Sequence, residues 1–321
     1  MQTRLLSAQS PVDLDEAAAV LRRGGLVAFP TETVYGLGAL ALDPLAVRGI
    51  FSAKGRPASN PVIIHVLGED DARALVTHWP MAAATLASSF WPGPLTLVLP
   101  RAPRVPDECT AGGDTVGVRA PSHPAARALL ERVGAPLAAP SANRAEHVSP
   151  TTAAHVLRDL NGRIDLVLDG GRCAFGIEST VVALDRAEPR LLRAGAIPRA
   201  AIEELIGPLS DGLSAGPAQS PGQHKRHYAP AGVVRLASRA RLAEVAASLQ
   251  GRVGALLHGG EAPAAAAVVR LPEDAAGYAR ELYASLRELE DAACAAIVIE
   301  EVPETPEWDA VRDRLQRAAA Q

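Results

Sequence analysis

The stretch from residue 26 to residue 65 limits what this chain can fold into more than any other part of the sequence. Its apolar run Leu26-Val-Ala-Phe29 ends abruptly in Pro30-Thr-Glu-Thr-Val-Tyr-Gly-Leu-Gly38. It then continues with Lys54-Gly-Arg-Pro57 and closes with Asn60-Pro-Val-Ile-Ile-His65. A β-type run that ends in hydroxyl, carboxyl and glycine residues places small polar groups at the carboxyl end of a strand, where open α/β sheets bind ligands. The stretch therefore predicts an α/β fold and the floor of a substrate site.

Start and stop signals divide residues 1–207 into alternating helices and strands. Ser10-Pro11 begins a helix that Gly24-Gly25 ends, and Asp43-Pro44 begins one that ends at Gly55. The same signals predict helices over 70–76, 81–90, 124–133, from 149 onward and 198–207, and strands over 26–29, 62–66, 95–99, 116–119, 137–139, 164–168, 180–184 and 190–193. This alternation predicts a twisted open sheet with helices as the first domain.

The rest of the chain separates into a linker and a second domain. Residues 208–230 are rich in Gly and Pro and lack apolar periodicity, although their end carries many donors and rings. In residues 231–321, β-like runs at 233–236, 253–257, 266–271 and 297–299 alternate with helical stretches at 239–249, 274–293 and 307–319. We predict domain boundaries at 1–207, 208–230 for a linker or lid, and 231–321 for a small Rossmann-like α/β domain.

The charge balance argues against a broad nucleic-acid-binding surface. The net charge is -4, with 22 basic and 22 acidic residues in 1–230 and 10 and 14 in 231–321. Non-specific binding of nucleic acid needs a clustered basic excess. We therefore expect no stable nucleic-acid complex.

Cysteine usage and hydropathy predict a cytoplasmic protein without a membrane span. Cys109, Cys173 and Cys294 lie far apart and show no C-x-x-C spacing, so neither a disulfide framework nor a zinc site is supported. No run reaches the roughly 18 apolar residues of a membrane helix, and the first residues lack the apolar core of a signal peptide.

A compositional bias points to two individual residues. Of the 32 basic residues, 30 are Arg and only Lys54 and Lys225 are Lys. A lysine that persists against such a bias can be needed for its compact ammonium group, with chance survival as the alternative. Both lysines fall in motif-like stretches, so we expect Lys54→Ala to lose activity with nearly unchanged thermal stability.

Polar residues at strand ends indicate the kind of ligand. The common nucleotide-binding motifs are absent from the sequence. Hydroxyl, amide and cationic groups instead follow the predicted strands, at Thr31, Thr33, Lys54, Arg56, Asn60, His65, Thr115, Arg119, Ser141, Asn143, Ser149, Ser179 and Arg193. Cations and hydroxyls without paired carboxylates suit an anionic, phosphate-bearing ligand.

Five motifs in this order resemble those of the YrdC-like threonylcarbamoyl-AMP synthase family. They are Pro30–Gly38, Lys54–Pro57, Val116-Gly-Val-Arg-Ala-Pro121, Ala139-Pro-Ser-Ala-Asn143 with Ser149-Pro-Thr151, and Gly176-Ile-Glu-Ser-Thr-Val181. The linker motifs Ser220-Pro-Gly222 and His227-Tyr-Ala-Pro230, with the small terminal domain, resemble the long, two-domain form of the family. The similarity covers nearly the whole chain.

The resemblance implies a nucleotidyltransferase reaction, in which L-threonine, bicarbonate or CO2, and ATP give L-threonylcarbamoyl-AMP and pyrophosphate. The product would pass to a separate tRNA threonylcarbamoyl transferase complex that modifies an adenosine. ATP would arrive with Mg2+, for which the sequence shows no dedicated carboxylate cage. Positioning and charge stabilisation would supply most of the rate.

The resemblance also implies the site residues. It places L-threonine against Thr33, His65, Arg119, Ala139 and Ser179, with Arg119 pairing with the threonine carboxylate. It places ATP against Arg56, Asn60, Thr115, Ser141, Asn143, Ser149, Arg193 and Tyr228. Lys54 and Arg56 would act in catalysis, and Tyr228 would close over the nucleotide as part of a lid.

Several roles stay open at this point. Ser149 is equally well explained as the N-cap of a helix, a role compatible with phosphate contact. Glu32 and Glu178 are conceivable general bases but remain unassigned, and Cys173 fits a small loop residue better than a nucleophile.

Two other functions compete with the synthase. One is an RNA-binding or ribosome-associated module that uses the same cationic groove. The other is a carbamoyl-transfer domain of a larger maturation enzyme, which would need catalytic domains that this chain lacks.

Overall fold

The computed structural model describes residues 2–212 and 228–320, and these form two compact units. Within the described residues, unit 1 comprises 2–145, 150–174 and 178–212, and unit 2 comprises 146–149, 175–177 and 228–320. Most of the predicted linker, with Lys225 and His227, lies outside the described residues. The unit boundaries follow contacts, so two short segments of the first 207 residues belong to unit 2.

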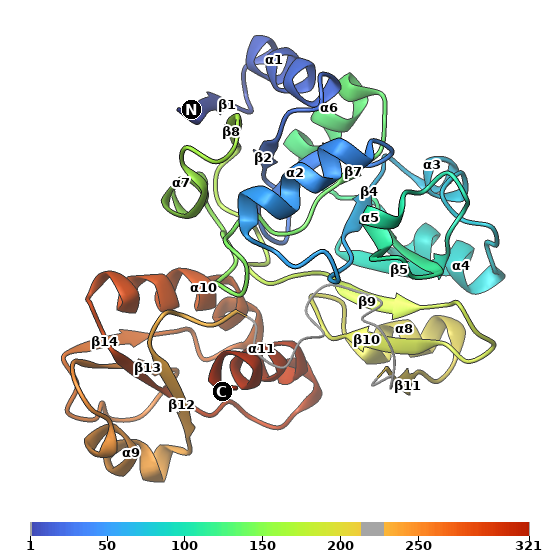
Figure 1. Ribbon diagram of the computed structural model, residues 1–321. Coiled ribbons are helices and arrows are strands. Elements are labelled where there is room, and N and C mark those ends of the chain that lie inside the picture. Colours follow the sequence, from blue (N-terminus) through green and yellow to red (C-terminus); the bar gives the residue numbers. More distant parts are fainter. Residues whose placement is uncertain (1, 213–227, 321) are drawn as a thin grey trace. The chain divides into compact units, whose positions relative to one another are not determined.

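Unit 1 is built on a mixed sheet with helices on both faces (Figure 1). The strand order is β1-β8-β2-β3-β7-β4-β6-β5-β9-β10-β11. The strands are β1 (Arg4–Ser7), β2 (Val27–Phe29), β3 (Gly36–Leu40), β4 (Ile63–His65), β5 (Leu95–Pro100), β6 (Thr115–Arg119), β7 (Leu137–Ala138), β8 (Leu166–Asp169), β9 (Thr180–Ala183), β10 (Arg190–Arg193) and β11 (Ser210–Asp211). The helices are α1 (Pro11–Arg22), α2 (Pro44–Lys54), α3 (Glu69–Arg73), α4 (Met81–Phe90), α5 (Asp107–Thr110), α6 (Pro124–Val133), α7 (Ala153–Leu160) and α8 (Arg199–Ile206).

Capping chemistry explains where the helices begin and end. The Ser10 side chain accepts a hydrogen bond from the amide of Asp13 at the start of α1, and Asp43 caps α2 in the same way. Gly55 ends α2 with a φ of 62°, a conformation that suits glycine. These predicted boundaries are confirmed.

The hairpin formed by β2 and β3 differs from the sequence prediction. Residues 31–35 do follow β2, but before it enters α2 the chain returns as the antiparallel strand β3, which the sequence did not predict. Glycines made residues 36–40 look like loop. Gly38 is required because a Cβ there would lie 2.7 Å from Cε1 of Phe29. The strands β1 and β11 and the short helix α5 were also not predicted.

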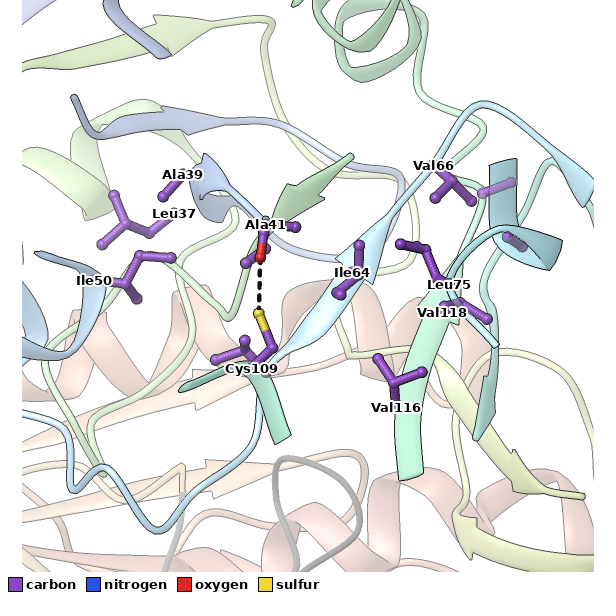
Figure 2. Close-up of a cluster of buried hydrophobic side chains, with 14 of the residues drawn as sticks. Leu37, Ala39, Ala41, Ile50, Ile64, Val66, Leu75, Cys109, Val116 and Val118 are labelled. Atoms are coloured by element: carbon purple, nitrogen blue, oxygen red, sulfur yellow. Dashed lines mark hydrogen bonds between the residues drawn. The ribbon is translucent and has the colours of Figure 1, made fainter. Parts of the chain in front are cut away.

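Alternate residues of β2 point into two different apolar clusters, one on each face of the sheet. Ala28 of β2 belongs to a large cluster with Ile50, Ile64 and Leu86, part of which Figure 2 shows together with the hydrogen bond of 3.3 Å from the Cys109 thiol to the Ala41 carbonyl. Its neighbours Val27 and Phe29 point the other way, into a cluster that α1 and α6 complete. Both faces of the sheet are therefore buried at β2.

Unit 2 contains a parallel sheet in the order β12-β15-β13-β14. Its elements are β12 (Val233–Ala237), η1 (Arg239–Arg241), α9 (Leu242–Ser248), β13 (Val253–Leu257), β14 (Ala267–Arg270), α10 (Ala275–Asp291), β15 (Ala296–Glu300), η2 (Pro306–Trp308) and α11 (Asp309–Ala319). The alternation of parallel strands and helices confirms the predicted Rossmann-like architecture.

The segments 146–149 and 175–177 are tied into unit 2 by specific contacts. Nη2 of Arg287, on α10, donates a hydrogen bond of 2.5 Å to the Val148 carbonyl. Gly176 has a φ of +75°, and a Cβ there would lie 2.5 Å from Cα of Arg280.

No helix in the described part of the chain is both long enough and apolar enough to cross a membrane.

Candidate functional site

The predicted threonine-site residues of β4 and β6 lie on one face of the sheet. His65 and Arg119 are register partners on these parallel strands, so their side chains leave the sheet on the same side. On the same side at Gly117, a Cβ would make ordinary contacts with Cγ2 of Thr96 at 3.4 Å and Cγ1 of Ile63 at 3.5 Å. This face is the one that also carries Phe29, whose ring meets His65 edge-on at a centroid distance of 6.2 Å.

Arg119 is a buried cation with one edge still open. Its side chain lies in a residue only 4% exposed, Nη2 donates to Oε1 of Glu32 at 2.6 Å, and Nε donates to the Gly93 carbonyl at 3.3 Å. Among the described residues, Nη1 has no hydrogen-bond partner. A guanidinium held in this way can offer its remaining edge to a carboxylate.

Glu32 completes this arrangement as the counter-ion of Arg119. Burial alone would raise its pKa, but the charge and the hydrogen bond of Arg119 outweigh burial and hold the pKa below its usual range. Its other oxygen, Oε2, accepts the backbone amide of Ser122 at 3.1 Å. Glu32 is therefore an ionised carboxylate with both oxygens engaged.

His65 is neutral beside this ion pair. Burial, with the positive charge of Arg119 as the second cause, lowers the pKa of His65 to about 3. Its Nδ1 is buried and has no partner among the described residues. A neutral imidazole offers one donor and one acceptor, so His65 can contact a hydroxyl or an amine.

The hairpin loop supplies a hydroxyl pair to the same region. Thr31 Oγ1 donates to the Val34 carbonyl at 2.6 Å and lies 2.8 Å from Oγ1 of Thr33. Because the single Thr31 proton is used on Val34, Thr33 donates its own proton to Thr31 and keeps its lone pairs as acceptors. Ala139 is fixed in place by its amide, which donates to the Ile63 carbonyl at 2.9 Å.

Ser179, a predicted threonine contact, is hydrogen-bonded to Arg193, a predicted ATP contact. Its Oγ accepts a hydrogen bond of 3.1 Å from Nη2 of Arg193, and Nε of Arg193 donates to the Ser179 carbonyl at 3.1 Å. Thr96 Oγ1 lies 2.8 Å from the same Oγ. Thr96 was not predicted, although a lone polar residue inside the apolar strand 95–99 was a signal that could have found it.

Lys54 binds the loop that follows β7. Its Nζ donates to the Ser141 carbonyl at 2.5 Å and to the carbonyl of Asn143, while Oδ1 of Asn143 lies at 3.5 Å. Burial, and then the charge of Arg56, lower the pKa of Lys54 well below its usual value. The ammonium group therefore organises the predicted ATP residues Ser141 and Asn143, and it is structural as well as charged.

The turn after α2 holds Arg56 and Asn60 close together. Nε of Arg56 donates to the Asn60 carbonyl at 3.3 Å, and Nη2 donates to the Pro61 carbonyl at 2.9 Å. Oδ1 of Asn60 is buried without a hydrogen-bond partner in the described chain. This amide oxygen is the kind of group that a ligand donor would satisfy.

Three further predicted residues have surroundings of their own. Thr115 begins β6, opposite Pro100. Ser149 is buried, but it is not the helix cap, because Thr152 caps α7. Tyr228 belongs to unit 2, where its ring stacks on Tyr283 at 5.8 Å and Cζ of Arg314 lies 5.1 Å from its centre.

The structure also bears on the Cys173 thiol. Burial raises the pKa of the Cys173 thiol to about 12, which agrees with a structural loop residue and not a nucleophile. No group of three or more His, Cys, Asp or Glu side chains in the described ranges is arranged to hold a metal ion.

The fold and the site together define a class of protein, the α/β proteins that bind a small anionic ligand at the face of a sheet. A buried guanidinium with an open edge, a neutral imidazole and inward hydroxyls on one face of an α/β sheet suit a small anionic ligand that is enclosed by the protein.

Comparison with known proteins narrows this class to a family. Residues 19–195 match a family model described as telomere recombination, named for Sua5, YciO and YrdC, and residues 197–320 match the threonylcarbamoyl-AMP synthase C-terminal domain. A threonylcarbamoyl-AMP synthase of Pyrococcus abyssi is 43% identical over 94% of this chain and 93% of its own length. One from Bacillus subtilis is 41% identical over 98% of this chain and 94% of its own.

A solved structure agrees. Pyrococcus abyssi Sua5 complexed with L-threonine aligns with a TM-score of 0.93 at 41% identity, covering 99% of this chain and 98% of that one. The chain belongs to the YrdC-like threonylcarbamoyl-AMP synthase family, in its long, two-domain form.

Proposed function

We propose that this chain is a nucleotidyltransferase that makes L-threonylcarbamoyl-AMP and pyrophosphate from L-threonine, bicarbonate or CO2, and ATP. The observation that carries the proposal is the open edge of Arg119 beside neutral His65 and the Thr33 hydroxyl. These groups match the carboxylate, amine and hydroxyl of threonine. The family membership of the chain supports the same reaction.

Threonine binds through its carboxylate to Nη1 of Arg119 in this proposal. His65, Thr33, Ser179 and the backbone at Ala139 contact its amine and hydroxyl. Because His65 is neutral, it adds no positive charge next to an amine that must lose its proton before it attacks carbon dioxide. Arg119, His65 and Ser179 all belong to strands or strand ends, which keeps their geometry rigid.

ATP is assigned to the cationic and amide groups of the 54–60 and 141–143 segments, with Thr115 and Arg193. Lys54 and Arg56 are the proposed catalytic cations, since they can offset the charge that develops on the phosphates. Ser149 and Tyr228, which belong to unit 2, remain proposed ATP contacts on the family resemblance alone. Magnesium enters as part of the ATP substrate.

The chemistry needs two bond-forming steps. The threonine nitrogen forms a bond with the carbon of CO2 and loses a proton, giving a carbamate. With bicarbonate as the source, that proton and the bicarbonate hydroxyl leave together as one water. A carbamate oxygen then attacks the α-phosphorus of ATP, and the bond to the β-phosphate oxygen breaks as pyrophosphate leaves. Holding the reactants in line is the main task of the protein.

Burial of the cations argues against the RNA-binding alternative. Lys54, Arg56, Arg119 and Arg193 are 3%, 7%, 4% and 5% exposed, and backbone carbonyls or Glu32 engage each of them. A phosphate backbone needs basic groups that reach the surface.

We further propose the cytoplasm as the compartment, in keeping with three cysteines that are all free and buried, and a separate transferase complex as the consumer of the product.

Threonine-dependent pyrophosphate release tests the proposed function. The protein is incubated with Mg-ATP, bicarbonate and L-threonine, pyrophosphate is quantified, and the adenylate product is identified by mass spectrometry. We expect release only when all three substrates are present. Release that continues without threonine, or none at all from folded protein together with tight binding of duplex RNA, would contradict the proposal.

A further inference from the structure

The buried ion pair of Glu32 and Arg119 has a role beyond charge balance. We propose that Glu32 is a positioning residue, whose carboxylate fixes the Arg119 guanidinium so that the Nη1 edge meets the carboxylate of the amino-acid substrate. This inference rests on the proposed function, because it concerns the same amino-acid subsite.

Two anchors leave the guanidinium a single orientation. Glu32 Oε1 accepts a hydrogen bond of 2.6 Å from Nη2, and the Gly93 carbonyl accepts one of 3.3 Å from Nε. Nε and Nη2 are two corners of one rigid planar group, so anchoring both fixes how that plane is turned. The nitrogen that the anchors leave over is Nη1.

Glu32 is itself held, so it can act as a rigid support. The backbone amide of Ser122 donates to Oε2 at 3.1 Å, and the two side chains of the ion pair are 6% and 5% exposed. Ser122 follows Arg119 by three residues, so the carboxylate bridges the end of β6 to the chain just beyond it. The hairpin loop after β2 thus positions a residue 87 positions away in the sequence.

The same contacts make Glu32 a poor general base. Arg119 holds its pKa below the usual range, and each oxygen already accepts a hydrogen bond. A general base should have a pKa near the working pH and a free lone pair aimed at the proton. Glu32 therefore acts through Arg119 and does not take a proton from the substrate.

The test compares Glu32→Gln with a matched control in the full-length protein. Glutamine keeps the size and removes the charge, so Arg119 loses its ionic anchor. We expect the Kd and KM for L-threonine to rise about 10- to 100-fold, with kcat and the KM for ATP within about twofold. Glu300→Gln is the control, because Glu300 is also a buried carboxylate that pairs with an arginine, Arg239, and accepts backbone amides, but in unit 2. It should leave threonine affinity unchanged.

Two further measurements separate positioning from a structural role. L-threonine amide lacks the carboxylate, so Glu32→Gln should weaken binding of threonine and leave binding of the amide at the wild-type value. In an Arg119→Met background, which removes the group through which Glu32 acts, Glu32→Gln should cause no further loss. Calorimetric titration measures each affinity, and circular dichroism confirms folding. If Glu32→Gln does not fold, Glu32→Asp replaces it with the same expected selectivity.

The outcomes distinguish the inference from the proposed function. Unchanged threonine affinity in folded Glu32→Gln, an equal loss for threonine and its amide, or a full further loss in the Arg119→Met background would each overturn the positioning role. Wild-type protein that binds no threonine would overturn the proposed function, and the inference with it.

Discussion

At the scale of single residues, the site is governed by charges that have been removed from water. Lys54, Arg119 and Glu32 are buried, and His65, beside Arg119 and Glu32, stays neutral. A buried charge is tolerable only where partners replace water. The backbone carbonyls around Lys54 and the carboxylate beside Arg119 serve that purpose, so each of these residues affects stability as well as chemistry.

His65 predicts a specific pH dependence of stability. The folded protein keeps His65 neutral down to a pKa of about 3, whereas the pKa of an unperturbed histidine is 6.5. Between these values the unfolded chain binds the proton and the folded chain does not, so acid favours unfolding. Relative to His65→Gln, the wild type should lose up to about 1.4 kcal/mol of unfolding free energy per pH unit below 6.5. Urea unfolding of both proteins at pH 7.5, 6 and 5 measures the difference, and a difference that does not change with pH would contradict the neutral buried imidazole.

Lys54→Ala should lower both activity and stability. This changes the expectation drawn from sequence, because the variant would leave the Ser141 and Asn143 carbonyls without their ammonium partner. Buried acceptors left unsatisfied cost about 1–3 kcal/mol each. Thermal denaturation should therefore show a clear drop in Tm, together with loss of pyrophosphate release. Arg48→Ala, on the exposed face of the same helix, is the control and should change neither measurement much. A Tm equal to that of the wild type would mean that the lysine contributes charge alone.

At the scale of elements, local sequence signals predicted where most helices and strands begin and end. They predicted few of the contacts between elements that are distant in the sequence. Helices α1 and α2 begin and end where Ser10, Asp43 and Gly55 indicated, because caps act within a few residues of chain. Strand β3 was missed because Gly36 and Gly38 resemble loop residues. The Phe29 ring, a contact between strands, is what requires the glycine at position 38. The pairing of Glu32 with Arg119 spans 87 positions, and no local pattern reports such a contact. The resemblance supplied the candidate residues, whereas the structure supplied their partners.

The β2–β3 hairpin gives a direct test at this scale. In Gly38→Ala, the new Cβ would lie 2.7 Å from the Phe29 ring, so the ring or the hairpin must shift. Overpacking of this kind typically costs about 1–3 kcal/mol. The shift would also move the loop that carries Thr33 and Glu32, so the KM for threonine should rise along with the loss of unfolding free energy. Gly68→Ala is a control, since nothing lies within 4 Å of a Cβ at that position. If Gly38→Ala kept the wild-type unfolding free energy and the wild-type KM for threonine, the Phe29 ring would be able to move aside without destabilising the protein.

At the scale of the whole molecule, the chain order and the structural units do not coincide. Segments 146–149 and 175–177 lie inside the sequence of the first domain, yet their contacts assign them to unit 2. The proposed site residue Ser149 belongs to the first segment, and Ser179 follows the second by two residues. Unit 2 therefore has a means to influence the reaction through the covalent chain, whatever role the linker plays.

The contact between Arg287 and Val148 tests this influence. Arg287 is buried on α10 and reaches a carbonyl 139 positions earlier in the sequence, one residue before Ser149. Arg287→Met keeps much of the apolar stem and removes the donor, which should cost about 1–3 kcal/mol. Hydrogen exchange should become faster in the amides of 146–149, and the KM for ATP should rise while the KM for threonine stays near that of the wild type. Arg252→Met is the control, because Arg252 also donates to a backbone carbonyl of unit 2 but is exposed. Faster exchange without any change in the KM for ATP would confine unit 2 to a supporting role and remove Ser149 from the proposed nucleotide contacts.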